Sequence, residues 1–187
     1  LYRSSAASDV YKRQIVVSLK KFGADAVSIH TKKNNIIKVT PEAKELGFVG
    51  IPNKIDNNLI EKILNKKQVP IISPLGLGND NNPYNINGDT AAGAIAKSLK
   101  SRRLLLMTNV EGVLDKDKKL INEITSTEVL KMVESNIITE GMIPKINTCL
   151  DAVKNGVTAV GIIDGRKQHS ILFEIFSDKG SGTLIRK

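Results

Sequence analysis

Residues 69–108 read VPIISPLGLGNDNNPYNINGDTAAGAIAKSLKSRRLLLMT. The apolar run Val69–Leu75 predicts a buried strand, and a loop rich in glycine and asparagine follows it over Pro74–Asp89. Small residues over Asp89–Leu99 predict a helix, and Leu104–Thr108 predicts a second apolar strand. Strand, loop, helix and strand in this order are typical of an α/β protein.

The same alternation of helices and strands continues on both sides of this stretch. Because helices separate successive strands, the strands are expected to lie parallel, with helices on both faces of the sheet. We therefore predict an α/β fold, a three-layer α/β/α sandwich with a mainly parallel open sheet. The further strands are expected over 26–30, 36–39 and 157–163, and the further helices over 15–22, 56–65, 126–134 and 146–154.

The first fourteen residues, Leu1–Gln14, differ from the rest of the chain. They show neither a helical nor a strand period, and they lack the apolar segment and cleavage site of a signal peptide. We predict that residues 1–14 are a non-native leader or an assembly scar. No repeat, linker or shift in composition divides the remainder, so residues 15–187 are expected to form one domain.

Composition excludes several classes of protein. The 187 residues are 41% hydrophobic and 25% charged, which is typical of a globular chain that buries a core without disulfides. The single cysteine and two histidines are too few for a structural zinc site. No run approaches 18 apolar residues, so no membrane span is expected.

The formal net charge of +9 has two interpretations. It indicates either an anionic partner, such as nucleic acid or a phosphorylated ligand, or a lysine-rich surface. The lysines are scattered, aromatic residues are 4% of the chain and tryptophan is absent, whereas single-strand binding relies on aromatic stacking. We favour the lysine-rich surface and expect no nucleic-acid partner.

The loop Pro74–Asp89 carries the first candidate site. Asn85, Asn87 and Asp89 alternate, so an extended segment would project all three side chains to one side. The alternative is structural, with Asp89 as the N-cap of the following helix and the asparagines as turn formers. A phosphate-loop lysine does not follow the glycines of this loop, which argues against that kind of nucleotide site.

Three later loops carry further candidates. Gly112 permits a turn after the strand Leu104–Thr108, where backbone amides can face a nucleotide. Lys145 follows Pro144 in the expected first turn of a helix, where a phosphate oxygen is favoured, although an ordinary exposed lysine is the alternative. Asp164 ends a strand before Gly165, a common loop composition with no chemistry of its own expected.

The remaining reactive side chains are expected to be structural. His30 and His169 are interpreted as surface or helix-start residues. Cys149 lies on the apolar side of its predicted helix, without a histidine nearby in the sequence, so we expect it in the core rather than as a nucleophile.

Five segments in order resemble the amino acid kinase family, and within it the enzymes that phosphorylate N-acetylglutamate. The resemblance runs in register from about Ile15 to Ile185 and corresponds to the carboxyl-terminal two thirds of those enzymes, including their ATP-binding half. The segments are YNINGDTAAGAIA (84–96), LLLMTNVEGVLD (104–115), IITEGMIPKINTCLDAV (137–153), GVTAVGIIDGR (156–166) and LFEIFSDKGSGTLI (172–185).

The resemblance implies a reaction and its partners. ATP, carrying Mg²⁺, would phosphorylate the δ-carboxylate of N-acetyl-L-glutamate to N-acetyl-L-glutamyl 5-phosphate in arginine biosynthesis. It also implies a cytoplasmic homo-oligomer, a dimer or hexamer, with no tightly bound cofactor and no metal held by the protein alone. The alternatives are a kinase of another acyl amino acid and a nucleotide-binding remnant without turnover.

The resemblance also implies roles for individual residues. Asn85 and Asn87 would bind the acetylated amino acid, Asp89 would orient lysine ammonium groups, and Lys145 would neutralise phosphate charge during transfer. Gly88 stands where the family usually has alanine. The implied nucleotide-binding residues are Thr108, Asn109, Val110, Gly112, Val113, Leu114, Ile137, Ile138, Thr139 and Met142.

Two further expectations concern regulation and completeness. Glu174 and the segment Asp178–Thr183, with Gly180, resemble the region that binds arginine as an inhibitor in some members. The K-x-G-G motif and the substrate-binding arginine of the family do not occur before Ile15, and the family's first strands are expected to be missing. Losing several transition-state contacts lowers the rate by about 10⁴-fold, so the chain as printed is expected to lack useful activity.

Overall fold

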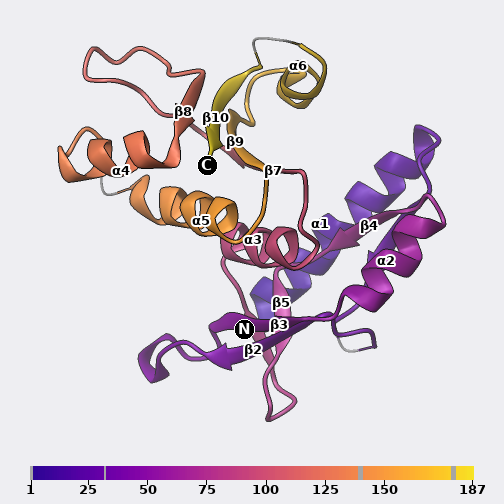
Figure 1. Cartoon of the computed structure of the whole chain (residues 1–187). Coiled ribbons are helices and arrows are strands. Elements are labelled where there is room, and N and C mark those ends of the chain that lie inside the picture. Colours follow the sequence, from indigo (N-terminus) through magenta and orange to yellow (C-terminus); the bar gives the residue numbers. More distant parts are fainter. Residues whose placement is uncertain (1, 32, 139–140, 178–179) are drawn as a thin grey trace. The chain divides into compact units, whose positions relative to one another are not determined.

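The chain divides into two compact units, Leu1–Ala94 and Ile95–Lys187. The computed structural model describes residues 2–31, 33–138, 141–177 and 180–187 (Figure 1). The helices are α1 (Tyr2–Lys21), α2 (Asn57–Asn65), α3 (Gly88–Ser98), α4 (Ser126–Glu134), α5 (Ile143–Lys154) and α6 (Ser170–Phe176), with a 3₁₀ turn at Lys44–Leu46. The strands are β1 (Ala26–Ile29), β2 (Ile37–Pro41), β3 (Gly50–Ile55), β4 (Val69–Ile72), β5 (Leu75–Leu77), β6 (Pro83–Asn85), β7 (Arg103–Thr108), β8 (Glu123–Thr125), β9 (Ala159–Asp164) and β10 (Gly182–Arg186).

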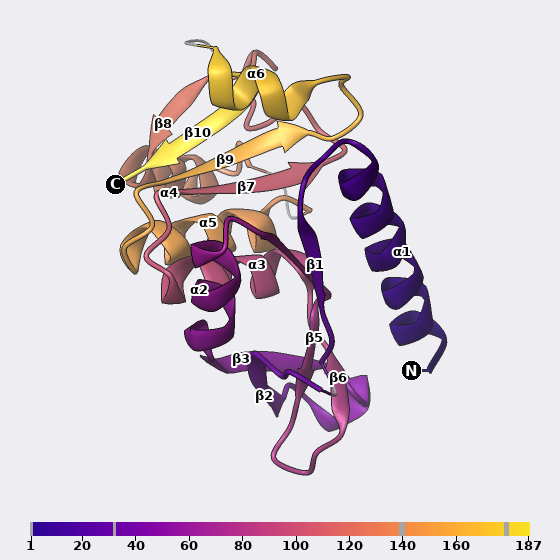
Figure 2. The same cartoon turned by 90° about the vertical axis from the view of Figure 1, so that its right-hand side faces the viewer.

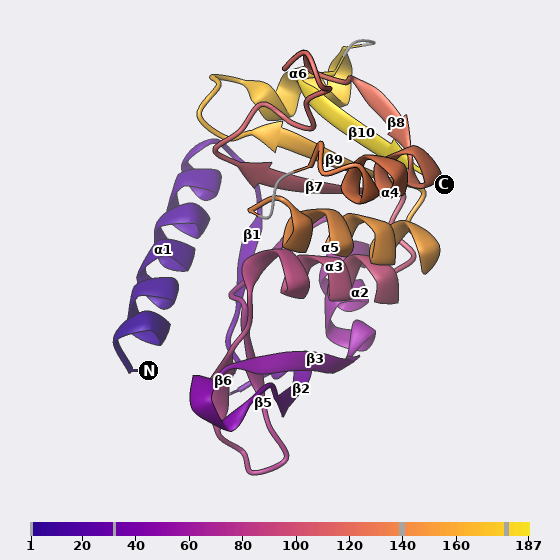
Figure 3. The same ribbon diagram turned by 90° about the vertical axis from the view of Figure 1, so that its left-hand side faces the viewer.

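The first unit contains a parallel pair, β1 and β4, in register from Ala26 opposite Val69. Helices α1 and α2 lie on opposite faces of this pair, as the three views agree (Figures 1, 2 and 3). The side chain of Asp56 caps α2 by accepting a 3.0 Å hydrogen bond from the amide of Asn58. Ile60 is buried, which places the apolar face of α2 against the sheet.

A second sheet of the first unit has the strand order β3-β2-β5-β6. Strands β5 and β6 form an antiparallel hairpin within the stretch that was predicted as a loop. The hydroxyl of Tyr84 donates a 2.9 Å hydrogen bond to Asp80 across this hairpin, which raises the pKa of Tyr84. Hydrogen bonds from the side chain and the amide of Asn82, with a smaller effect from Tyr84, lower the pKa of Asp80. A Cβ at Gly76 would lie 2.5 Å from the Val39 side chain, so β5 and β2 approach closely because Gly76 lacks one.

The second unit is built on the four-stranded sheet β7-β9-β10-β8. Strands β7 and β9 are parallel, β9 and β10 antiparallel, and β10 and β8 parallel. Helix α6 covers one face, while α4 and α5 cover the other (Figure 2). All six residues of β9 are buried, and Ile146 and Cys149 of α5 are fully buried in the same unit. The core of this unit therefore lies on β9.

The α/β fold is confirmed, and so is the expectation that Cys149 is a core residue. The β1–β4 pair is parallel, whereas the two four-stranded sheets are mixed, because each combines parallel and antiparallel pairings. Both histidines are exposed, as expected. No helix in the described part of the chain is both long and apolar enough to cross a membrane.

The amino-terminal segment differs from the sequence-based expectation. Helix α1 begins at Tyr2 and runs through the predicted boundary after Gln14, and the ammonium group of buried Lys12 donates a 3.0 Å hydrogen bond to the carbonyl of Ile29. Helix formation here needs no amphipathic period, because the segment contains neither proline nor glycine before Gly23. The non-native origin of residues 1–14 stays a prediction.

Replacing Ile162 in β9 by alanine is expected to lower the free energy of unfolding by about 2–5 kcal/mol, because the side chain is fully buried. Ile171→Ala is the matched control, since Ile171 is 42% exposed on α6 and its loss is expected to cost about 0.5 kcal/mol or less. Urea titrations followed by circular dichroism measure both values. Equal losses would contradict the central position of β9.

Candidate functional site

The carboxyl ends of β7 and β9 lie side by side in the second unit. Thr108 pairs with Asp164 at the last position of the register, and the amide of Gly165 donates a 2.8 Å hydrogen bond to the Thr108 carbonyl. Ligands of α/β proteins bind beyond the carboxyl ends of parallel strands. The loops that follow Thr108 and Asp164 are therefore the candidate site of this unit.

The loop after β7, residues 109–114, is called the glycine loop here. Gly112 has a φ of +148°, a conformation that side chains rarely adopt. Val113 is 2% exposed, and its amide donates a 2.8 Å hydrogen bond to the hydroxyl of Thr183. Asn109 and Val110 are exposed. Leu114 is 37% exposed. The loop thus has a buried, fixed part at Gly112 and Val113, and exposed residues that ligands can reach.

The turn after β9 is held by one carboxylate. Asp164 is 3% exposed, and its two oxygens each accept a 2.9 Å hydrogen bond from the guanidinium of Arg166, from Nε and Nη2. One oxygen also accepts the Arg166 amide at 2.9 Å. These hydrogen bonds lower the pKa of Asp164 to about 2 and raise that of Arg166. From the sequence, no chemistry was expected of this turn.

An ion pair links the two loops. The ammonium group of Lys167 lies 2.7 Å from Oε1 of Glu111 in the glycine loop, with both side chains about half exposed. Surface ion pairs contribute little to stability. The pair still places a lysine beside the loop for which the family resemblance implies nucleotide binding.

Lys145 lies in the first turn of α5, as predicted. Pro144 precedes it in the same turn, and Met142 is the N-cap residue. Lys145 is half-buried. Unpaired amides and the positive end of the helix dipole favour an anion at such a turn.

The other residues expected near this turn differ in exposure. Ile138 is 6% exposed and Ile137 is 36% exposed, so only Ile137 presents much surface to a ligand. Thr139, the third predicted residue of this segment, lies outside the described residues.

The first unit holds the residues expected to bind the acetylated amino acid. Asn85 ends β6, and its amide donates a 2.8 Å hydrogen bond to the carbonyl of Phe48. Asn87 accepts hydrogen bonds from the amides of Asp89 at 3.0 Å and Thr90 at 3.2 Å. Asn87 therefore caps α3, and the structural alternative that made Asp89 the cap is wrong.

The alternation of Asn85, Asn87 and Asp89 does not continue as an extended segment. Helix α3 begins at Gly88, so Asp89 lies in its first turn, half-buried. The three residues belong to the first unit, and Lys145 belongs to the second.

A polar pocket of about 300 Å³ lies in the second unit. Oε2 of buried Glu174 accepts a 3.0 Å hydrogen bond from the amide of Ser181, and Oε1 lies 3.8 Å from Nη1 of Arg103. The structure brings together Glu174 and Gly180, as expected for the arginine region, while Asp178 lies outside the described residues. The lining residues are Arg103, Asn122, Glu123, Glu174, Ser177, Gly180, Leu184 and Arg186.

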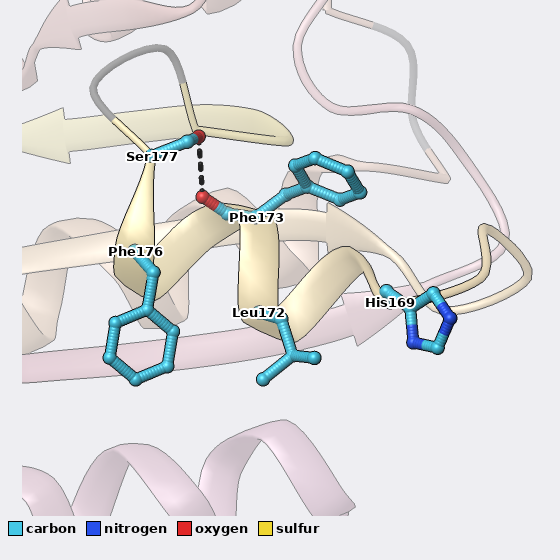
Figure 4. Close-up of a pocket in the computed structure, with 5 residues that line it drawn as sticks. All are labelled: His169, Leu172, Phe173, Phe176 and Ser177. Atoms are coloured by element: carbon cyan, nitrogen blue, oxygen red, sulfur yellow. Dashed lines mark hydrogen bonds between the residues drawn. The ribbon is translucent and has the colours of Figure 1, made fainter.

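A second hollow, of about 420 Å³, lies along α6. Figure 4 shows that Leu172, Phe173 and Phe176 project from this helix, with His169 at its start. The Ser177 hydroxyl donates a 2.6 Å hydrogen bond to the Phe173 carbonyl. Most of the described residues that line it are apolar or aromatic.

No cluster of three or more His, Cys, Asp or Glu side chains suited to a metal ion occurs among residues 2–31, 33–138, 141–177 and 180–187. Two features of the site were not predicted from the sequence: the Asp164–Arg166 pair and the hydroxyl of Thr183. The Asp164–Arg166 pair carried a signal in the D-G-R sequence, since aspartate at a turn often binds a nearby amide. No sequence signal pointed to the hydroxyl of Thr183, because it contacts Val113 only in the folded chain.

Residues 5–164 match the amino acid kinase family. A protein of Pelagibacter ubique (strain HTCC1062) named acetylglutamate kinase is 52% identical over 177 residues, which cover 95% of this chain and 62% of that protein. The chain thus spans about three fifths of the length of this relative.

Solved structures share the fold. The crystal structure of smu.665 from Streptococcus mutans UA159 has a TM-score of 0.81 and 31% identity, covering 98% of this chain and 69% of that one. N-acetylglutamate synthase from Neisseria gonorrhoeae has a TM-score of 0.91, covering 100% of this chain and 43% of that one. At 22% identity the second likeness shows the fold alone.

The pKa of Asp164 predicts a pH dependence of stability. The pKa of Asp164 in the folded chain, about 2, lies below the ordinary value of 3.8. The ionised carboxylate therefore stabilises the fold above pH 3.8, and this stabilisation is lost as the pH falls toward 2. Arg166→Ala removes the guanidinium and is expected to raise the pKa of Asp164 toward 3.8. Carboxyl ¹³C NMR measures this shift, and an unchanged titration in the variant would contradict the pairing.

Proposed function

The chain belongs to the amino acid kinase family, and on that premise we propose that it forms the nucleotide-binding part of an acetylglutamate kinase. ATP would phosphorylate the δ-carboxylate of N-acetyl-L-glutamate, giving N-acetyl-L-glutamyl 5-phosphate and ADP. Mg²⁺ would accompany the nucleotide. The chain matches about three fifths of its relative, so the reaction is proposed for the protein of which these residues form a part.

The observation that carries the proposal is Lys145 in the first turn of α5, within the unit that also holds the glycine loop. A phosphate at this turn would meet helix amides and a lysine charge together. The glycine loop would contact the rest of the nucleotide through exposed Asn109 and Val110. The lysine charge and the helix amides suit a triphosphate better than they suit an uncharged ligand.

The proposed step needs no covalent intermediate with the protein. A δ-carboxylate oxygen would form a bond to the γ-phosphorus while the bond from that phosphorus to the β,γ-bridging oxygen breaks, and ADP takes the electron pair. The carboxylate is already ionised at neutral pH, so no base is required. Such a reaction depends on positioning and charge neutralisation, the work proposed for Lys145.

Asn85 and Asp89 complete the proposal from the first unit. An asparagine amide suits the acetyl and carboxylate oxygens of the substrate, because it donates and accepts hydrogen bonds. The Asp89 carboxylate suits the orientation of lysine ammonium groups. Asn87 caps α3 through Oδ1, which leaves its amide nitrogen as the group proposed to face the substrate.

Regulation and assembly extend the proposal. The polar pocket offers the Glu174 carboxylate to a guanidinium and the Arg103 and Arg186 side chains to a carboxylate, so arginine is its proposed ligand. We also propose a homo-oligomer, a dimer or hexamer, acting in the cytoplasm.

Binding of the MgATP complex by this chain tests the proposal. Lys145→Met removes the charge at the first turn of α5 and is expected to weaken binding by roughly 10- to 100-fold, the loss typical of a hydrogen bond to a charged group. Isothermal titration calorimetry measures the affinity. Lys154→Met, at the opposite end of the same helix, is the control and is expected to bind like the wild type.

Two results would contradict the proposal. The first is an absence of heat when MgATP is titrated into the wild-type chain. The second is an equal loss of affinity in both variants. A coupled assay for ADP formation with N-acetyl-L-glutamate separates binding from turnover, which is expected to be undetectable for the chain as printed.

The arginine site has its own test. Glu174→Gln keeps the shape of the side chain and removes its charge, so it is expected to weaken arginine binding by roughly tenfold or more. Calorimetry with L-arginine measures this, and Glu134→Gln on exposed α4 is the matched control. Arginine that binds the Glu174 variant as tightly as the wild type would exclude this pocket.

A further inference from the structure

Thr183 has a buried hydroxyl that the proposed reaction does not use. The residue is fully buried in β10, and its Oγ1 accepts a 2.8 Å hydrogen bond from the amide of Val113. The same oxygen donates a 2.6 Å hydrogen bond to the carbonyl of Ile121. One hydroxyl thus joins the segment that follows β7, at Val113, to the segment that precedes β8, at Ile121.

These two segments are the arms of one loop. The amide of Ile121 donates a 2.9 Å hydrogen bond to the Val113 carbonyl, which closes the arms on each other. A threonine hydroxyl has a single proton. Because that proton is directed at the Ile121 carbonyl, the oxygen can accept the Val113 amide, and each of the two backbone groups has a hydrogen-bond partner.

Gly112 fits against the same side chain. A Cβ at this position would lie 2.5 Å from the Thr183 hydroxyl oxygen and 3.1 Å from its backbone nitrogen. The first of these distances is shorter than real Cβ contacts, so a side chain at this position would force Thr183 or the loop to move. The φ of Gly112, +148°, excludes most other residues as well. The glycine loop therefore packs directly against Thr183 at Gly112.

The backbone of β10 holds Thr183 itself in place. Thr183 pairs with Ile162 of β9, and the amide of Leu184 donates a 2.9 Å hydrogen bond to the Asn122 carbonyl. The neighbouring Gly182 lies so close to β9 that a Cβ there would be 2.0 Å from the Ile162 carbonyl oxygen. Thr183 is thus attached to the most buried strand of the unit.

From this geometry we infer that Thr183 is a positioning residue, which fixes the glycine loop in the conformation that binds the nucleotide. The inference rests on the proposed nucleotide site. Thr183 is fully buried, so its hydroxyl would act through the Val113 amide. The loop is fixed before the nucleotide arrives, so removal of the hydroxyl weakens binding without removing any contact to the ligand.

Three variants separate this role from a general effect on stability. Thr183→Val keeps the shape of the side chain but leaves the Val113 amide without its acceptor, whereas Thr183→Ser keeps the hydroxyl. Ile185→Val removes one methyl group from a buried position of the same strand and serves as the control. Hydrogen exchange followed by NMR reports each amide in the nucleotide-free chain.

In the Thr183→Val variant, the amide of Val113 is expected to exchange roughly tenfold or more faster, while the amides of β9 change much less. Thr183→Ser restores slow exchange, and Ile185→Val leaves the glycine loop as in the wild type. Acceleration that is absent in Thr183→Val, or that is equal throughout the unit, overturns the inference.

Calorimetry with MgADP then tests the consequence for binding. Thr183→Val is expected to bind roughly tenfold or more weakly, with Thr183→Ser close to the wild type. If the wild type binds and Thr183→Val binds equally well, the inference alone is overturned. If the wild type binds no nucleotide, the proposed function fails, and the role of Thr183 toward the nucleotide fails with it.

Discussion

Strand β9 is buried along its whole length, and the loops that carry the proposed nucleotide site depend on it. Strand β7 lies parallel on one side and β10 antiparallel on the other. The approach of β10 is close enough to require glycine at position 182, where no side chain fits against the Ile162 carbonyl. The next residue, Thr183, is thereby fixed relative to β9. The hydrogen bond between Thr183 and the Val113 amide in turn holds the glycine loop. The turn at Asp164 follows directly after β9.

Patterns of neighbouring residues in the sequence correctly predicted several helices and strands that bury one apolar face. The helix expected over 126–134 has the same bounds in the structure, because Thr125 and Glu128 form a capping box that sets its start. Lys145 was predicted in a first helical turn for a comparable reason, since proline is favoured there. Each prediction needed only neighbours in the sequence. The same is true of the α/β alternation that predicted the fold class.

Contacts between segments far apart in the sequence could not be predicted from such patterns. Strands β5 and β6 have three residues each, too few for a period, and they form because they pair with each other and β5 also pairs with β2. Asn87 and Asp89 are both good capping residues, and the point at which α3 begins selects Asn87. The Thr183 hydroxyl meets an amide 70 residues away. A buried threonine of this kind looks in sequence like any other strand residue.

The glycine loop has a held part and an exposed part, which suits the nucleotide site proposed for it. Ordering a loop when the ligand binds would consume binding free energy, whereas a loop ordered by folding spends none. Val113 and Gly112 are fixed by Thr183, and Asn109 and Val110 remain at the surface. The Asp164–Arg166 turn is held in the same way, by a carboxylate bonded to its own loop. Substitutions in the held part should therefore act on affinity through loop geometry, and those in the exposed part through contact with the ligand.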